Sequence, residues 1–240
     1  MRRYSSLLLA DVKNIRRDPM LILATMGPVV MAVVFRFVVP ILSDWLEQSM
    51  HFRLSDYYEL ILVIILQLVP LMLGMIVGYV MLDERDEQLI QLFAVTPLRK
   101  SGYLWIRLIV PMVITLFFTV FLIYFVDLMP VDWRTLLLFL PFQLLLTPIF
   151  ALLLVGFAAN KVEGLAFTKG AGILVLVPLI AYFVKWPWQL MVGIFPTYWS
   201  SKVFFVEGQG GGTWFFWGMG ILVHLVLFWY CYVKFEERVD

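Results

Sequence analysis

The sequence predicts an all-α integral membrane protein with six transmembrane helices, and three observations support this fold class. Of 240 residues, 62% are hydrophobic and 15% are charged, whereas ordinary soluble domains have about 45–50% and about 25%. The mean hydropathy is +0.93. Six apolar stretches reach the roughly 20 residues that a helix needs to cross a bilayer. The lysines and arginines, in addition, gather in alternate connecting segments.

The six predicted spans form one transmembrane domain over residues 1–240, at approximately 20–41, 58–82, 103–126, 135–159, 165–184 and 214–233. Backbone groups in hydrocarbon must be hydrogen-bonded within the protein, so a span is a helix or a strand of a closed barrel. A barrel strand would alternate apolar and polar residues over about 10 positions. Runs such as 60–82 are instead apolar on every face, which favours helices.

The distribution of positive charge sets the expected orientation. If the N-terminus is cytoplasmic, most lysines and arginines fall in inner segments, and the outer segments hold only Arg53, Arg134, Lys185 and Lys202. Short cytoplasmic loops of membrane proteins carry such an excess. We therefore expect both termini on the cytoplasmic side.

The residue inventory argues against several functional classes. A net charge of +1 lacks the basic excess of a nucleic-acid binder. The single cysteine, Cys231, and two histidines leave no disulfide and no cluster of metal ligands. The glycine-rich stretch 208–212 leads to Thr213 without the lysine of a P-loop, and neither H-E-x-x-H nor G-x-S-x-G occurs. We therefore expect no enzymatic activity and no cofactor in this chain.

The loop after span two, residues 83–102, is the most informative segment. It opens with four acids that favour a helix N-terminus, Asp83, Glu84, Asp86 and Glu87. An apolar face and a proline stop follow, formed by Leu89, Leu92, Phe93, Thr96 and Pro97. The pattern predicts a short amphipathic helix that either contacts another protein or lies on lipid headgroups. The acids favour a protein partner, because an anionic leaflet repels them.

The N-terminal segment, residues 1–19, also has an amphipathic pattern. Leu8, Val12 and Ile15 fall on one stripe, and Arg16 and Arg17 follow near its end. This pattern predicts an interfacial helix. A simple positively charged membrane anchor explains it equally well.

A further segment on the outer side, residues 186–201, carries no charge and is interrupted by Pro187, Gly193 and Pro196. It is too short and too broken to cross a bilayer. We expect it to enter the outer boundary of the membrane and return, with Trp186, Trp188 and Trp199 as interfacial anchors.

Two polar side chains lie inside predicted spans. Arg36 is about 24 Å along a helix that rises about 1.5 Å per residue, in the outer third of the bilayer. We favour outward snorkelling for Arg36 over pairing or a substrate-facing role, and Glu59 is its best-placed partner. His224 lies near the middle of span six and is more typical of an interhelical hydrogen bond than of a proton relay.

Several motifs, taken together and in order, resemble those of the ABC-2 family of exporter permeases. They are Arg17-Asp18-Pro19, Asp83-Glu84-Arg85-Asp86-Glu87 running to Val95-Thr96-Pro97-Leu98, and Asn160-Lys161-Val162-Glu163-Gly164-Leu165-Ala166 with Lys169. The last is similar to the inner loop of bacterial drug and antibiotic exporters in that family. Many relatives carry Gly-Thr where this chain has Gln88 and Leu89.

The resemblance implies a permease subunit in a bacterial plasma (inner) membrane that exports a hydrophobic or amphipathic drug, antibiotic or lipid-like molecule. It implies a dimer with a second permease protomer, and an ABC ATPase subunit that binds ATP and Mg²⁺. The ATPase contacts would come from the interfacial helix and from Glu84, Arg85, Asp86, Glu87, Leu89, Leu92, Phe93, Thr96 and Pro97. The alternatives are an ATP-independent secondary transporter or channel, and a membrane scaffold without transport; a carrier should have more ionisable groups near the midplane than His224 alone.

Overall fold

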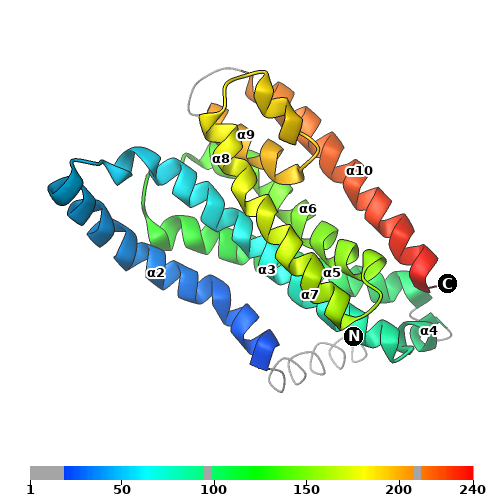
Figure 1. Ribbon diagram of the computed structural model, residues 1–240. Helices are drawn as coiled ribbons and strands as arrows, with labels where there is room; N and C mark the ends of the chain where they lie inside the picture. The colour runs from blue at the N-terminus through cyan, green and yellow to red at the C-terminus, as the bar shows by residue number, and fades with distance from the viewer. Residues whose placement is uncertain (1–18, 95–98, 208–211, 240) are drawn as a thin grey trace.

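The computed structural model describes residues 19–94, 99–207 and 212–239, and its regular elements within these ranges are all helical. Six helical segments are long and apolar enough to cross a membrane: Met26–Met50, Leu54–Asp86, Lys100–Val126, Trp133–Phe157, Lys161–Phe183 and Thr213–Val239. The predicted fold class, all-α with six candidate spans, is confirmed. Figure 1 shows these helices as one elongated bundle.

The elements follow one another as α2 (Pro19–Met50), η1 (Leu54–Tyr57), α3 (Tyr58–Asp86), α4 (Leu89–Ala94), α5 (Arg99–Val126), α6 (Trp133–Phe157), α7 (Lys161–Ala171), η2 (Gly172–Leu176), α8 (Val177–Phe183), η3 (Trp188–Val192), α9 (Pro196–Glu207) and α10 (Thr213–Val239). The labels η mark 3₁₀ helices. The first span was predicted to end at residue 41, but α2 continues to Met50. The helix accommodates Pro40, and no glycine follows that would end it earlier.

The centre of the bundle is the pair α3 and α6. In their most apolar stretches 72% and 67% of the residues are buried within the protein, against 17–33% in the other four spans. Two glycines one turn apart, Gly74 and Gly78, let the two helices approach closely. A Cβ atom on Gly74 would lie 2.5 Å from the carbonyl oxygen of Thr147, and one on Gly78 would lie 2.9 Å from Cβ of Leu154. Small residues at such spacing are a common basis of helix association in membranes.

The outer helices have large faces that no other part of the described chain covers. α2 and α10 run along opposite edges of the view in Figure 1. In α2 the exposed side chains include Val30, Phe37 and Ile41, and in α10 they include Trp214 and Trp229. Such apolar surface is suited to lipid or to a second membrane protein.

The fifth span is interrupted near its middle. α7 and α8 are separated by the 3₁₀ turn η2, and Pro178 stands in the first turn of α8. Proline lacks the backbone N–H that, in a continuous α-helix, would donate to the carbonyl four residues earlier. The backbone hydrogen bonds of the preceding turn are therefore rearranged. The span is therefore two short helices in series.

The segment after the fifth span forms η3 and α9 at the end of the bundle opposite α4 (Figure 1). Met191 and Ile194 are among its exposed apolar residues. Trp199, expected at the interface, is instead 4% exposed and donates its Nε1–H to the carbonyl of Gly193 at 2.6 Å. It faces the bundle because α9 packs between α6, α8 and α10. Whether the segment enters the membrane boundary stays a prediction.

The close α3–α6 contact predicts a sharp difference between two glycine substitutions. Gly74→Ala should destabilise the protein by about 1–3 kcal/mol, the usual effect of overpacking, because its Cβ would meet the backbone of Thr147. Gly218→Ala on α10 is the matched control, since nothing lies within 4 Å of its Cβ position. The measurement is thermal unfolding of the purified chain in detergent. Equal unfolding temperatures for the two variants would contradict the packing argument.

Candidate functional site

The acidic segment after the second span differs from its prediction. We expected Asp83, Glu84 and Asp86 at the N-terminus of a separate helix, but they form the last turn of α3. The helix continues because neither glycine nor proline follows the apolar run. It ends at Asp86; Glu87 is the C-cap residue, and the next residue, Gln88, adopts a left-handed φ of 60°. A short helix, α4, then begins only at Leu89, beyond the acids, so the prediction that this helix starts among them was wrong.

The carboxylate of Glu84 forms the central interaction at this end of the bundle. Its Oε2 accepts hydrogen bonds from the hydroxyl of Tyr103 at 2.5 Å and from Nε of Arg107 at 2.9 Å. Its Oε1 pairs with Nη2 of the same arginine. The side chains of Arg107 and Glu84 are 8% and 12% exposed. This two-pronged ion pair, the strongest geometry for arginine and carboxylate, joins α3 to α5.

The next residue, Arg85, joins α3 to α6. Its Nη1 donates to the carbonyls of Val155 at 2.8 Å and Ala158 at 2.9 Å, and its Nη2 donates to Ala159 at 2.8 Å. These carbonyls lie at the C-terminal end of α6, where backbone acceptors lack intrahelical partners and a positive charge is favourable. We call Glu84, Arg85, Tyr103 and Arg107 together the inner clamp.

The start of α7 is fastened to the same region. The side chain of Asn160 accepts from the N–H groups of Val162 and Glu163, both at 3.0 Å, and so caps the helix. Lys161 pairs with Asp83 at 2.8 Å. Four helices, α3, α5, α6 and α7, therefore meet through polar contacts at the end of the bundle that is predicted to be cytoplasmic. This also explains how acids are tolerated at the C-terminus of α3, where the helix dipole disfavours them.

α4 rests on this clamped region through one buried side chain. Ile90 is 1% exposed and belongs to a cluster of buried residues that includes Tyr103, Leu104 and Leu108 of α5. Leu92, on the same short helix, is 60% exposed. α4 is thus anchored on one side and leaves an apolar side chain free on the other. Sequence reasoning missed Ile90 because its position, four residues before Ala94 and 13 before Tyr103, belongs to no distinctive pattern.

The predicted contact residues fall into three groups. Glu84 and Arg85 point into the bundle. Asp86, Glu87 and Leu92 are exposed, and Leu89 is half-buried. The others are not placed: Phe93 lies in α4 but its side chain is not described, while Leu8, Val12, Ile15, Arg16, Arg17, Thr96 and Pro97 lie outside the described residues.

For Arg36 we favoured outward snorkelling over pairing and considered Glu59 as the partner, and for His224 we expected a hydrogen bond to another helix. Arg36 does not pair with Glu59; its Nη1 contacts Asp127 Oδ2 at 3.1 Å and donates to the carbonyl of Val126 at 3.3 Å. Asp127 follows the end of α5 with a φ of 50°, and this turn brings its carboxylate to α2. His224 was expected to bond to another helix, but its Nδ1 bonds to the carbonyl of Gly220 in its own helix at 2.7 Å. Among the described residues no group of three or more His, Cys, Asp or Glu could hold a metal ion.

The inner clamp predicts an asymmetric response to substitution. Glu84→Ala would remove the carboxylate that pairs with the buried guanidinium of Arg107, and removing one partner of a buried ion pair typically costs about 3–5 kcal/mol. Replacing both partners, as Glu84→Gln with Arg107→Met, should recover part of that loss. Glu87→Ala, at an exposed acid three residues away, is the control and should change stability by less than about 0.5 kcal/mol. A Glu84→Ala protein that unfolds at the temperature of the control would show that the clamp does not stabilise the bundle.

Comparisons with known proteins identify relatives of this chain. A family model for the fluoroquinolones export permease protein Rv2686c-like family matches residues 11–232. The fluoroquinolones export permease protein Rv2686c of Mycobacterium tuberculosis strain ATCC 25618 / H37Rv is 26% identical over 231 residues, which cover 95% of this chain and 92% of the relative. The protein MT2760 of strain CDC 1551 / Oshkosh, of the same description, matches with the same figures. No solved structure matches the chain. The chain is a multi-pass membrane protein of the bacterial inner membrane, and it belongs to the fluoroquinolones export permease protein Rv2686c-like family.

Proposed function

We propose that this chain is the permease subunit of an ABC-2 type exporter and that a separate ATPase subunit binds Mg²⁺ and ATP and drives it. Membership of an export permease family over residues 11–232 carries the proposal. The chain itself contributes no catalytic residue to ATP hydrolysis, since its sequence holds no P-loop. A second permease protomer, identical or different, completes the transporter in this proposal.

The inner clamp and α4 are well built for transmitting movement from an ATPase. A partner that binds the exposed side of α4, around Leu92, would push on a helix that is anchored by Ile90 against α5. The push would reach α3 and α5 through Glu84 and Arg107, and α6 through Arg85. In this proposal the clamp keeps the inner ends of these helices moving as one body.

Buried polar groups support a second arrangement of the helices. The hydroxyls of Thr115 in α5 and Thr147 in α6 lie 2.7 Å apart. One turn farther toward the outer end, the side-chain amide of Gln143 and the hydroxyl of Thr119 are buried and make no hydrogen bond within the described residues. Each unsatisfied group costs about 1–3 kcal/mol. A protein that alternates between packings can satisfy such groups in its other state.

The proposed cargo is an amphipathic aromatic drug of the fluoroquinolone class. The two mycobacterial relatives are named as fluoroquinolones export permeases, and both align over nearly the whole of this chain. The spans also carry exposed aromatic side chains, among them Phe117, Tyr124 and Trp105 in α5.

An export assay separates the ATP-driven exporter from a secondary transporter. Inverted membrane vesicles from bacteria that express the chain together with its ATPase subunit should accumulate norfloxacin, a fluorescent fluoroquinolone, when ATP is added, and vesicles that contain the ATPase subunit but lack the chain should not. Vanadate should abolish the accumulation. Accumulation that persists with vanadate and disappears with a protonophore would overturn the ATP-driven mechanism while leaving a transporter.

The coupling role of α4 can be tested at two neighbouring exposed positions. Leu92→Asp should prevent binding of the ATPase subunit, because it removes apolar burial worth about 1.5–3 kcal/mol and places a charge in the contact. Gln91→Asp introduces the same charge on the same helix at an exposed position and should keep binding. The measurements are co-purification of the ATPase subunit and ATP-dependent export. If Leu92→Asp retains both, α4 is not the transmission element.

A further inference from the structure

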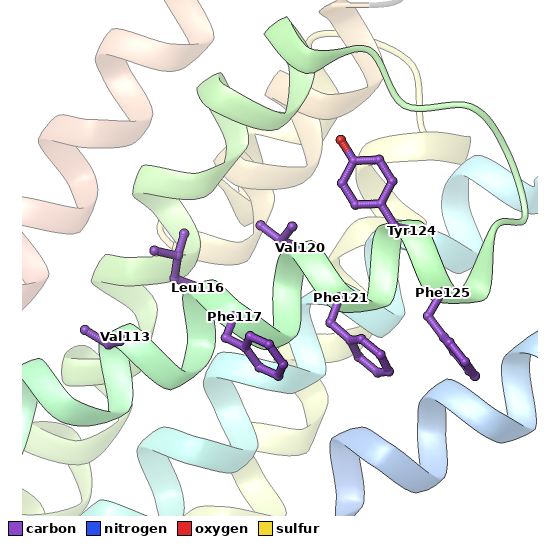
Figure 2. A pocket seen from close by; sticks show the side chains of 7 residues that line it. All are labelled: Val113, Leu116, Phe117, Val120, Phe121, Tyr124 and Phe125. Atoms are coloured by element: carbon purple, nitrogen blue, oxygen red, sulfur yellow. The ribbon is translucent and has the colours of Figure 1, made fainter.

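The interruption of the fifth span, residues 170–176, lies beside an open apolar groove of about 450 Å³. We call these residues the break. One wall of the groove belongs to α6 and the other to α7 and η2, and its lining residues are Leu153, Ala166, Phe167, Gly170, Ala171 and Leu174. A larger apolar groove of about 670 Å³ differs in kind, because all the side chains that line it come from α5 alone (Figure 2). A groove with walls on two elements closes when one element moves toward the other.

The break follows from the backbone chemistry of Pro178. In a continuous α-helix the N–H of residue 178 would donate to the carbonyl of Leu174, but proline has no N–H. This carbonyl instead accepts from the N–H of Val177, three residues on, which is the 3₁₀ pattern of η2. It also accepts from the hydroxyl of Thr197 in α9, at 3.1 Å. A side chain of α9 thus supplies a donor at the point where the fifth span lacks one.

The outer half of the fifth span, α8, is held by α9 and α3. Thr197 is 1% exposed, and its carbonyl accepts a hydrogen bond from Nε2 of Gln67 in α3 at 2.9 Å. α8 packs against α9, and its residues Val177 and Ala181 are buried. The hydroxyl of Thr197 therefore fastens the break to a well-packed part of the bundle.

The other half, α7, is attached at the opposite end. Lys161, at its start, pairs with Asp83 beside the inner clamp. Between this attachment and α8 lie Gly170 and Gly172, and no packing neighbour in the described chain lies within 4 Å of a Cβ placed at either position. Close packing therefore does not require glycine there. Glycine does widen the range of backbone angles, and a 3₁₀ stretch in the middle of a helix often marks a hinge.

We propose that the fifth span bends at the break, so that α7 moves against α6 and closes the groove while α8 stays on α9. Thr197 is the positioning residue of this hinge, because it holds the carbonyl of Leu174 from α9. The proposal rests on the proposed function only in assigning the bend to the export cycle. In that cycle a movement at the inner clamp would reach α7 through Asp83 and Lys161.

Distances between spin labels measure the bend in the full-length chain. Val162 in α7 and Phe183 in α8 are exposed, and each is labelled together with the exposed Leu137 of α6. The substitutions are Val162→Cys, Phe183→Cys and Leu137→Cys, in a chain whose native cysteine is removed by Cys231→Ser. The labelled chain is placed in nanodiscs of phosphatidylcholine and phosphatidylglycerol.

Only the label on α7 should report movement. α7 has 11 residues and is therefore about 16 Å long, so that a bend of about 20° moves its far end by about 5 Å. The distances between positions 162 and 137 should spread over about this range, whereas those between 183 and 137 should form one narrow population. Equally narrow distributions for both pairs would overturn the proposal.

Two variants should change the bend in opposite directions. Gly170→Ala with Gly172→Ala stiffens the break and should narrow the distribution between positions 162 and 137. Thr197→Val keeps the shape of the side chain but removes the hydroxyl, and it should broaden that distribution. Ser200→Ala is the matched control, because it removes a buried hydroxyl of α9 that bonds to the carbonyl of Thr197 and not to the break. If Thr197→Val broadens the distances of both label pairs alike, it loosens the whole bundle and the proposal is wrong.

Pro178→Ala tests the reason for the hydrogen bond from Thr197. Alanine at this position has an N–H that can serve the carbonyl of Leu174. Thr197→Val should lower the unfolding temperature by about 2–4 °C in the wild-type chain, and by less than about 1 °C in the Pro178→Ala chain, because the two sites are coupled. Equal losses in the two backgrounds would show that Thr197 stabilises α9 and does not position the hinge.

Export connects the hinge to the proposed function. In vesicles that also contain the ATPase subunit, Gly170→Ala with Gly172→Ala should reduce ATP-driven export of norfloxacin several-fold. Gly218→Ala, at another open glycine of the described chain, is the control and should keep export. Normal export by the stiffened chain would remove the hinge from the cycle and overturn the proposal. A wild-type chain that does not export but still bends, as shown by the label distances, loses the proposed function and keeps the hinge.

Discussion

The close approach of α3 and α6 is the contact on which the rest of the protein depends. In a bilayer, apolar side chains gain little by leaving lipid for protein, so helices associate where their backbones can come close together. Gly74 and Gly78 provide that closeness. The inner clamp also holds α3 and α6 together, because the side chain of Arg85 extends from α3 and donates hydrogen bonds to carbonyls at the C-terminal end of α6. At the other end, Gln67 of α3 donates to the hydroxyl of Ser201 at 2.6 Å and so holds α9.

The fold could be predicted from the sequence because the bilayer acts as a simple solvent. A helix of about 20 apolar residues is the only open-ended segment that satisfies its own backbone there, and counting such stretches is sufficient. The break between α7 and α8 was less visible. Pro178 lies inside a long apolar run, and prolines such as Pro70 and Pro111 are accommodated within continuous helices of the same protein.

The pairing of charges could not be predicted in the same way. Glu84 and Arg107 are 23 residues apart, and Arg36 and Asp127 are 91 apart, so their contacts depend on which helices are neighbours. Glu59 was a reasonable partner for Arg36 because the two residues were predicted at a similar depth in the membrane. Depth does not determine which neighbouring helix Arg36 faces. The acidic segment was misplaced for a related reason. The helix dipole disfavours acids at a helix C-terminus, but nearby cations can offset this, and here Arg107 and Lys161 pair with Glu84 and Asp83 at the end of α3.

The conformation of Gln88 has a mechanical consequence. Its φ of 60° lies in the left-handed region, which a residue with a side chain adopts at some cost and within a narrow range of angles. Glycine at this joint would remove that cost but would also widen the range of backbone angles available. With glutamine, the link between α3 and α4 is comparatively stiff. A displacement of α4 would then be transmitted to Glu84 with little bending at residue 88, whereas a glycine at this position would make the link between α3 and α4 more flexible.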